Sequence, residues 1–163
     1  MFDSQPLGDE HDLTTFTSGN AELDRWLIEF ARSAEAKRVS RTFVWTDRGE
    51  VLAYYSISAH LLQRDELPTK LGRGNPTQIP AVLLGRLALH EKLHGQRRGG
   101  ELLTDALGRI LDATDIVAAR FVVVDAIDDN AVEFYLHHGF PPIPNSMRLV
   151  QKVSDIAAAL NSS

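Results

Sequence analysis

The chain of 163 residues contains no cysteine, and none of its hydrophobic runs approaches the length of a membrane span. The absence of cysteine excludes disulfides, thiolate nucleophiles and cysteine–zinc sites. A secretory signal is also lacking, because the first residues, "MFDSQPLGDEHD", are polar and acidic instead of basic and then apolar. The hydrophobic share of 44% and the charged share of 24% are ordinary for a globular protein. We therefore expect a cytoplasmic protein without a membrane anchor, folded as a single domain over residues 1–163.

Acidic residues outnumber basic ones, which gives a formal net charge of −5. This charge argues against a protein that binds nucleic acid with its whole surface. The basic residues nevertheless gather in two segments, 32–41 and 92–98. They could form a local basic surface on an acidic protein, or they could be solvated helix ends.

The hydrophobic pattern predicts a chain that alternates between helices and strands. Residues 20–36 begin with the N-cap residue Asn20 and repeat apolar residues at three- and four-residue spacing, which is typical of an amphipathic helix. Two β-rich runs on either side of residues 46–50 indicate a β-hairpin. The other expected elements are an irregular connection at 63–80, strands at 81–90, 120–127 and after 140, and helices at 99–113, 128–139 and 154–160, the last capped by Ser154.

Two motifs overlap in residues 88–103, "ALHEKLHGQRRGGELL". The first is H-E-x-x-H from His90 to His94, whose histidines bind zinc when they lie on one face of a helix. A helix does not fit here, because a β-type apolar run precedes His90 and Gly95 directly follows His94. The longer metzincin pattern is also absent. We therefore predict that this stretch holds no metal.

The same stretch fits a phosphate-binding loop better. A buried strand ends near His90, a loop rich in glycine and arginine follows, and a helix begins at Gly99 and Gly100. Free N–H groups and the helix dipole favour an anion at such a junction, and glycine lets the backbone approach it closely. Arg97 and Arg98 add positive charge where a pyrophosphate would lie. The loop is neither a Walker A nor a Rossmann motif, and an ordinary strand–loop–helix connection is the alternative.

The order of these elements, together with "AVEFYLHHGF" at residues 131–140, resembles the GNAT acetyltransferase superfamily over nearly the full length. The family's cofactor signature, Q/R-x-x-G-x-G/A, maps to residues 94–99. His94 replaces the first Gln or Arg, and Arg97 replaces the first glycine. The resemblance implies an α/β (α+β) protein with the GNAT fold, in which helices flank a mixed central β-sheet and splayed central strands form the acetyl-CoA cleft.

Within this superfamily the chain is most similar to the TacT/AtaT-like toxins of toxin–antitoxin modules, whose phosphate loops include arginine-rich versions. Five blocks match in the right order, at residues 16–31, 41–58, 83–111, 122–144 and 147–160.

The resemblance implies acetyl-CoA as co-substrate, no metal, and Tyr135 as the proton donor to the departing CoA thiolate. A phenol suits this role because it is protonated at neutral pH, although Tyr135 could also be a packed aromatic residue. His137 and His138 share no helical face with Tyr135 and are expected on the surface or as caps. Asn130 is implied as a CoA contact, with helix capping as the alternative. The implied cofactor contacts are Leu87, Ala88, Leu89, His94, Gly95, Gln96, Arg97, Arg98, Gly99, Gly100 and Asn130.

The resemblance also implies the acceptor, because the toxin relatives acetylate the α-amine of an amino acid esterified to tRNA and so block translation. Such an amine is substantially neutral near pH 7, and no strong general base is required. Arg86 could anchor its strand through an ion pair or contact the substrate. The candidate tRNA contacts are Arg32, Lys37, Arg38, Arg41, Arg86 and Lys92.

Partners follow from the same resemblance: a ribbon-helix-helix antitoxin, operator DNA reached only through the antitoxin complex, and a second copy in a homodimer. Two other functions stay open. The first is a GNAT N-acetyltransferase for a small amine or a protein N-terminus. The second is a non-catalytic co-repressor that acts by binding its antitoxin on DNA, against which Tyr135 and the phosphate loop argue.

Overall fold

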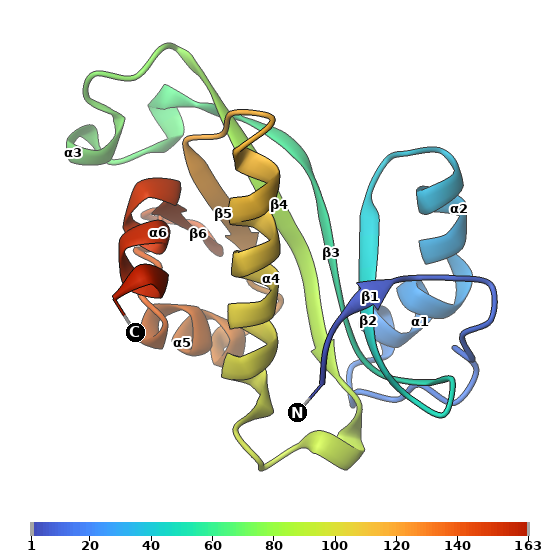
Figure 1. The fold of residues 1–163 in the computed structure, drawn as a ribbon. Helices are drawn as coiled ribbons and strands as arrows, with labels where there is room; N and C mark the ends of the chain where they lie inside the picture. Colours follow the sequence, from blue (N-terminus) through green and yellow to red (C-terminus); the bar gives the residue numbers. More distant parts are fainter. Residues whose placement is uncertain (1, 163) are drawn as a thin grey trace. The chain divides into compact units, whose positions relative to one another are not determined.

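The structure, a computed structural model, describes residues 2–162 and contains two compact units. Unit 1 comprises Met1–Ser58 and Arg86–Ala106, and unit 2 comprises Ala59–Gly85 and Leu107–Ser163. The strands form a six-stranded sheet in the order β1-β2-β3-β4-β5-β6 (Figure 1). The pairing of β4 with β5 is parallel, whereas β1–β2, β2–β3 and β5–β6 are antiparallel. The predicted mixed sheet with helices is therefore confirmed.

Unit 1 contains the predicted β-hairpin and the first helices. Asp47 pairs with Glu50, and the two residues between them, Arg48 (φ 54°) and Gly49 (φ 82°), both have a positive φ. This is the type I′ geometry that matches the twist of hairpin strands. The elements of this unit, in whole or in part, are β1 (Gln5–Pro6), α1 (Ala21–Glu29), α2 (Ala31–Ala36), β2 (Arg41–Asp47), β3 (Glu50–Gln63), β4 (Gln78–Leu89), η2 (Glu91–Leu93) and α4 (Arg98–Thr114).

The single helix predicted over residues 20–36 is two helices. The predicted N-cap is correct, since the side chain of Asn20 accepts a hydrogen bond from the amide of Leu23 at 3.0 Å. At Phe30 the backbone leaves the helical region (φ −122°, ψ −23°), and α2 begins at the next residue. No glycine or proline marks this break, so the apolar spacing alone could not predict it.

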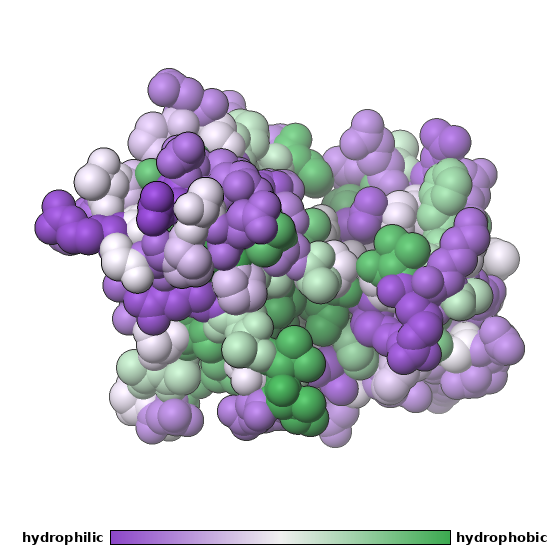
Figure 2. All heavy atoms as spheres, turned by 90° about the horizontal axis from the view of Figure 1, so that it is seen from above, coloured by the Kyte–Doolittle hydropathy of each residue, from purple (hydrophilic) through white to green (hydrophobic). Residues whose placement is uncertain are grey.

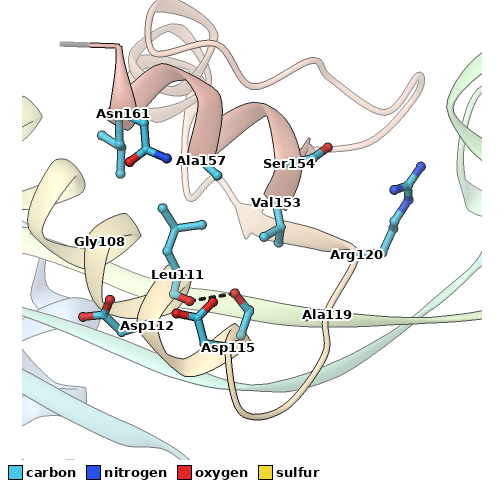
Figure 3. A pocket seen from close by; sticks show the side chains of 12 residues that line it. Gly108, Leu111, Asp112, Asp115, Ala119, Arg120, Val153, Ser154, Ala157 and Asn161 are labelled. Atoms are coloured by element: carbon cyan, nitrogen blue, oxygen red, sulfur yellow. Dashed lines mark hydrogen bonds between the residues drawn. The ribbon is translucent and has the colours of Figure 1, made fainter.

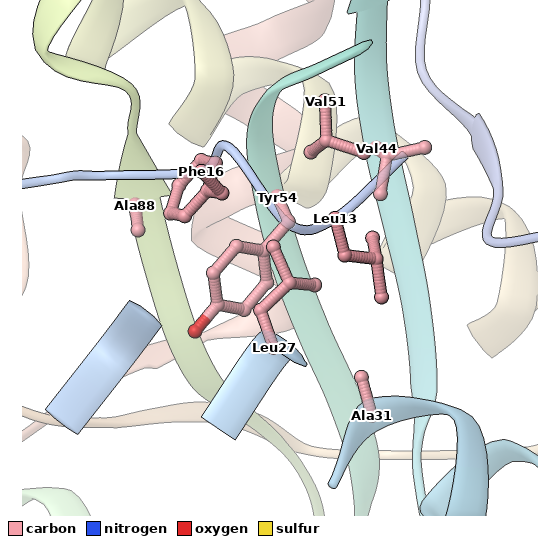
Figure 4. Close-up of a cluster of buried hydrophobic side chains, with 8 residues drawn as sticks. All are labelled: Leu13, Phe16, Leu27, Ala31, Val44, Val51, Tyr54 and Ala88. Carbon is pink, nitrogen blue, oxygen red and sulfur yellow. The ribbon is translucent and has the colours of Figure 1, made fainter. Parts of the chain in front are cut away.

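The core of unit 1 joins α1 and α2 to β2 and β3. Leu27 and Ala31 face Val44 and Tyr54 in one cluster of buried side chains (Figure 4). Burying each large apolar side chain contributes roughly 1.5–3 kcal/mol. The hydroxyl of Tyr54 donates to the carbonyl of Leu23 at 2.6 Å, so the one polar atom of this ring is satisfied at the edge of the cluster.

Unit 2 is organised around β5, which lies between β4 and β6 in the sheet. Its core includes Phe121, Val123 and Val150, all fully buried. No helix within residues 2–162 is both long enough and apolar enough to cross a lipid bilayer. The remaining elements are η1 (Arg64–Glu66), α3 (Thr69–Gly72), β5 (Phe121–Asp125), α5 (Asp129–His137), β6 (Arg148–Lys152) and α6 (Val153–Asn161).

The predicted cap of the last helix is wrong. The helix α6 begins at Val153, so Ser154 lies within its first turn and the N-cap is Lys152, which makes no side-chain capping bond. The strand β6 leads directly into α6 without the loop in which a serine cap would stand.

One arginine connects four elements of unit 2. Arg148 on β6 forms a bidentate pair with Asp125 on β5, at 2.8 and 3.0 Å. Its Nη1 donates to Glu66 and to Nε2 of His60, both at 3.1 Å. The hydrogen bond to Asp125 raises the pKa of Arg148, and burial together with Arg148 lowers the pKa of His60. The guanidinium therefore stays charged and the imidazole neutral near pH 7.

Candidate active site

The phosphate loop (residues 94–100) comprises the turn between η2 and α4 and the first residues of α4, within unit 1. Gly95 (φ 76°) and Arg97 (φ 59°) both adopt the left-handed backbone conformation, whereas Gln96 between them does not. Alternation of this kind is typical of an anion-binding nest, in which successive N–H groups turn toward one side. Arg97 stands where the family signature has glycine, and it adopts the backbone conformation that favours glycine. The departure from the signature thus places a side chain at a position whose backbone conformation favours glycine.

Replacing Arg97 by glycine should stabilise the protein by about 0.5–1 kcal/mol. A residue with a Cβ pays roughly 1–2 kcal/mol in the left-handed region, and the greater unfolded-state freedom of glycine offsets part of the gain. Urea unfolding would measure the difference, with Arg97→Ala as the matched control that keeps the strain. A glycine variant no more stable than the alanine variant would contradict the left-handed assignment.

Most side chains of the phosphate loop hold the loop itself. His94 Nε2 lies 3.0 Å from the carbonyl oxygen of Leu89, and Gln96 donates to the carbonyl of Lys92 at 3.0 Å. Arg98 forms an ion pair with Glu101 of the same helix at 2.8 Å. Arg97 is exposed and has no such partner in the part of the chain that the structure describes. Of the two arginines, Arg97 is therefore the one available to an incoming anion.

His90 is a buried cap and not a metal ligand. Its Nδ1 accepts a hydrogen bond from the amide of Lys92 at 3.1 Å, so the ring proton is on Nε2, which donates to the carbonyl of Thr15 at 3.2 Å. The H-E-x-x-H stretch forms a short 3-10 helix and a turn instead of the α-helix that a zinc site requires. Within residues 2–162 no three His, Cys, Asp or Glu side chains gather as a metal site would require.

Replacing His90 by alanine should lower stability by about 1–3 kcal/mol, because two partly buried backbone groups lose their partner. The acetyl transfer that the family resemblance implies should persist, and metal analysis should give the same result as for the wild type. Stoichiometric zinc that disappears with the substitution would reinstate the H-E-x-x-H motif as a metal site.

Tyr135 lies on α5 in a mostly aromatic environment. Its side chain is buried, and its ring packs edge-on against Phe134 and Phe140, with centroids 5.2 and 5.7 Å away. Burial raises the pKa of the Tyr135 phenol above its ordinary value. The hydroxyl makes no hydrogen bond to another described residue, and it keeps its proton at neutral pH. Such a group can donate a proton to a departing thiolate.

The other candidate residues near Tyr135, namely Asn130, His137 and His138, lie near the two ends of α5. The N-cap is Asp128, whose side chain accepts from the amide of Ala131 at 2.8 Å, so capping does not explain Asn130. Asn130 is exposed in the first turn of the helix. At the other end, His137 is exposed and His138 is the C-cap, as expected.

The ladder between β4 and β5 ends before β4 does. In the described residues the parallel register runs from Ala81–Phe121 to Leu84–Val124, and β4 continues to Leu89. Pairing thus stops one residue before Gly85, in line with the splayed central strands that the family resemblance implies. Leu87, Ala88 and Leu89, predicted to bind the pantetheine arm, lie on the part of β4 beyond this point.

Three of the predicted tRNA contacts are occupied within the protein. Arg32 donates to two backbone carbonyls, at 2.7 and 3.3 Å. Arg41 pairs with Glu35 at 2.9 Å, and Lys92 pairs with Glu50 at 2.9 Å. The groups that engage these three side chains are distant in the sequence or lie on other elements. The positions of the basic residues in the sequence therefore could not predict these contacts.

Lys37 and Arg38, at the end of α2, are exposed and form no ion pair among the described residues. Three large apolar residues nearby in the sequence are also exposed. They are Ile28 on α1, Phe30 between α1 and α2, and Val39 after α2. Figure 2 shows hydrophobic residues interrupting a mostly hydrophilic face of the molecule in this manner. The end of α2 is therefore a mixed basic and apolar surface and not a purely basic one.

A separate cavity of about 580 Å³ lies between the end of α4 and α6 in unit 2. Leu111 points from α4 toward α6, and Asp112 and Asp115 line the α4 side (Figure 3). None of the predicted site residues lines this cavity.

Comparisons with known proteins agree with the fold. No protein-family model matches the chain. A tRNA-acetylating toxin of Mycobacterium tuberculosis is 34% identical over 149 residues, which cover 90% of each chain. Among solved structures, a mutant of KacT has a TM-score of 0.89 and 25% identity, covering 97% of this chain and 98% of that one. AtaT complexed with acetyl-methionyl-tRNA has a TM-score of 0.88 and 26% identity, covering 98% and 99%.

These similarities define the class of the protein as one with the GNAT acetyltransferase fold. AtaT has also been solved with acetyl-CoA and with the C-terminus of its antitoxin AtaR. Because the mycobacterial relative exceeds 30% identity over most of both chains, the chain belongs to the family of tRNA-acetylating toxins.

Proposed function

We propose that this protein transfers the acetyl group of acetyl-CoA to the α-amine of an aminoacyl-tRNA and thereby stops translation. The observation that carries the proposal is the 34% identity to a tRNA-acetylating toxin across 90% of both chains. The phosphate loop and the protonated phenol of Tyr135 provide the chemistry that this reaction needs.

In this proposal the phosphate loop binds the pyrophosphate of acetyl-CoA. The backbone N–H groups around Gly95 and Arg97, the start of α4 and the Arg97 guanidinium all favour an anion there. The backbone of Leu87–Leu89 pairs with the pantetheine arm. Asn130, which is free of a capping role, provides a further polar contact to the cofactor.

The chemical step requires one proton from the protein. The neutral amine attacks the thioester carbon, a carbon–nitrogen bond forms, and the carbon–sulfur bond breaks. Tyr135 donates its phenolic proton to the departing sulfur and regains a proton from solvent, while the new amide loses its extra proton to water. Near neutral pH enough of the amine is unprotonated for the reaction to proceed without a strong base.

We also propose the partners of this activity. By analogy with AtaT bound to its antitoxin AtaR and with the KacTA–DNA complex, an antitoxin of the ribbon-helix-helix type neutralises the protein and links it to operator DNA. The protein acts in the cytoplasm as a homodimer, with residues 1–163 of each copy as one catalytic domain.

Incubation of the purified protein with acetyl-CoA and a pool of charged tRNAs tests the proposal. We expect N-acetyl-aminoacyl ends, detected by mass spectrometry after nuclease digestion, and growth arrest on expression that a neighbouring antitoxin gene reverses. Turnover of a polyamine or a peptide N-terminus without any acetylated tRNA would overturn the proposal in favour of an ordinary GNAT enzyme.

A further inference from the structure

Arg86 is a partly buried cation for which the described residues supply no anion. Its Cζ lies over the ring of Trp26 on α1, 3.9 Å from the centroid, and it forms no ion pair or hydrogen bond within residues 2–162. The carboxylate of Asp24 on the same helix is engaged by the amide and hydroxyl of Ser18, at 2.9 and 2.6 Å. Burial accordingly lowers the pKa of Arg86. A positive charge held in this way has a binding preference for an external anion.

The surface beneath Arg86 is rigid. Trp26 stacks on Tyr54 with a centroid distance of 6.0 Å and an interplanar angle of 14°, and Tyr54 is fully buried and hydrogen-bonded to Leu23. A guanidinium over an aromatic ring keeps the N–H donors at its edge available, in the fork that matches a phosphate. Arg86 is thus preorganised as an anion-binding group, unlike exposed arginines such as Arg97 that have no partner among the described residues to hold the side chain.

The chemistry of the reaction restricts the anion. The acetyl group is neutral, and the phosphate loop accounts for the pyrophosphate of acetyl-CoA. The ribose 3′-phosphate of the cofactor lies beyond that pyrophosphate, at the end of the molecule away from the thioester. An aminoacyl ester has lost its carboxylate charge, so the acceptor amino acid supplies no anion either. The phosphodiesters next to the ester are what remains, and Arg86 is only one residue from Leu87, where the predicted acetyl-CoA contacts of β4 begin.

We infer that Arg86, fixed on Trp26, binds a phosphodiester of the single-stranded 3′ end of the acceptor tRNA and so positions the aminoacyl ester. The inference rests on the proposed function. It assigns Arg86 a positioning role. In this role Arg86 is neither an ion-paired anchor of its strand nor part of a general basic surface.

The test measures tRNA binding by the whole protein as a function of salt concentration. The probes are deacylated bulk tRNA and the same tRNA with its 3′-terminal CCA removed. We expect Arg86→Gln to bind intact tRNA roughly tenfold more weakly. The slope of log affinity against log salt should shrink by about 0.7, the value for one phosphate of a single strand. Both proteins should bind the trimmed tRNA equally.

Two further variants complete the test. Arg73→Gln removes the same charge from an exposed position and should leave both affinities unchanged. Arg86→Lys keeps the charge but loses the planar fork, so it should retain the salt slope and weaken binding of intact tRNA only. Should Arg86→Gln fail to fold, the difference between intact and trimmed tRNA in Arg86→Lys decides the question.

Equal loss of affinity for both tRNAs, or an unchanged slope, would overturn the inference. Acetylation of charged tRNA by the wild type is measured separately. Its absence would overturn the proposed function, whereas the binding measurements still decide whether Arg86 contacts the 3′ end.

Discussion

Replacing Tyr135 by phenylalanine should slow acetyl transfer by about 10²–10⁴-fold, the usual contribution of a general acid. The variant should fold normally, because the ring keeps its contacts with Phe134 and Phe140 and the lost hydroxyl has no hydrogen-bonding partner among the described residues. Acetyl-CoA should still bind with wild-type affinity. In cells the same substitution should convert a growth-arresting protein into a harmless one.

The control for this experiment is Tyr55→Phe. The Tyr55 hydroxyl donates to Asp105 at 2.8 Å, so its loss should lower stability by about 1 kcal/mol without reducing the rate of acetyl transfer. Because burial raises the pKa of Tyr135, wild-type activity should not fall between neutral pH and pH 10 through loss of that proton. Equal initial rates for the wild type and Tyr135→Phe would remove Tyr135 from the mechanism.

The second large effect should follow from replacing Arg97 and Arg98 together by alanine. Each charge-assisted contact to a phosphate is worth roughly 1.5–3 kcal/mol, so the affinity for acetyl-CoA should fall at least tenfold. The single variants should differ, because Arg98 is already paired with Glu101 and Arg97 is not. Arg97→Ala should account for most of the loss.

Isothermal titration calorimetry would measure these affinities, with circular dichroism to verify that the start of α4 is intact. Unchanged binding of acetyl-CoA by the double variant would show that the loop is an ordinary connection. A larger loss for Arg98→Ala than for Arg97→Ala would mean that the Arg98–Glu101 pair opens when the cofactor binds.

Local signals predict much of this fold correctly. The hairpin was predictable because Gly49 lies between two β-rich runs, and α4 was predictable because its apolar residues follow helical spacing. The two-residue strand β1 has no pattern of its own and exists because Gln5 and Pro6 pair with β2. The break at Phe30 likewise has no helix-breaking residue to mark it in the sequence.

The candidate site divides in the same way. The phosphate loop and Tyr135 lie in continuous motifs, and the resemblance to a family could identify them. The stacking of Arg86 on Trp26 joins residues far apart in the sequence, and only the fold brings them together. The engagement of Arg32 by backbone carbonyls is equally invisible in a list of basic residues.

The left-handed backbone at Arg97 has a consequence for how such proteins are found in genomes. A search pattern that requires glycine at this position rejects the chain, although the arginine there adopts the left-handed backbone conformation that favours glycine. This chain places arginine in that conformation at Arg38, Arg48 and Arg97. A sequence profile that asks for residues able to adopt a positive φ would accept asparagine, aspartate or arginine as well as glycine at this position. Such a profile would retain relatives that a glycine-only pattern excludes.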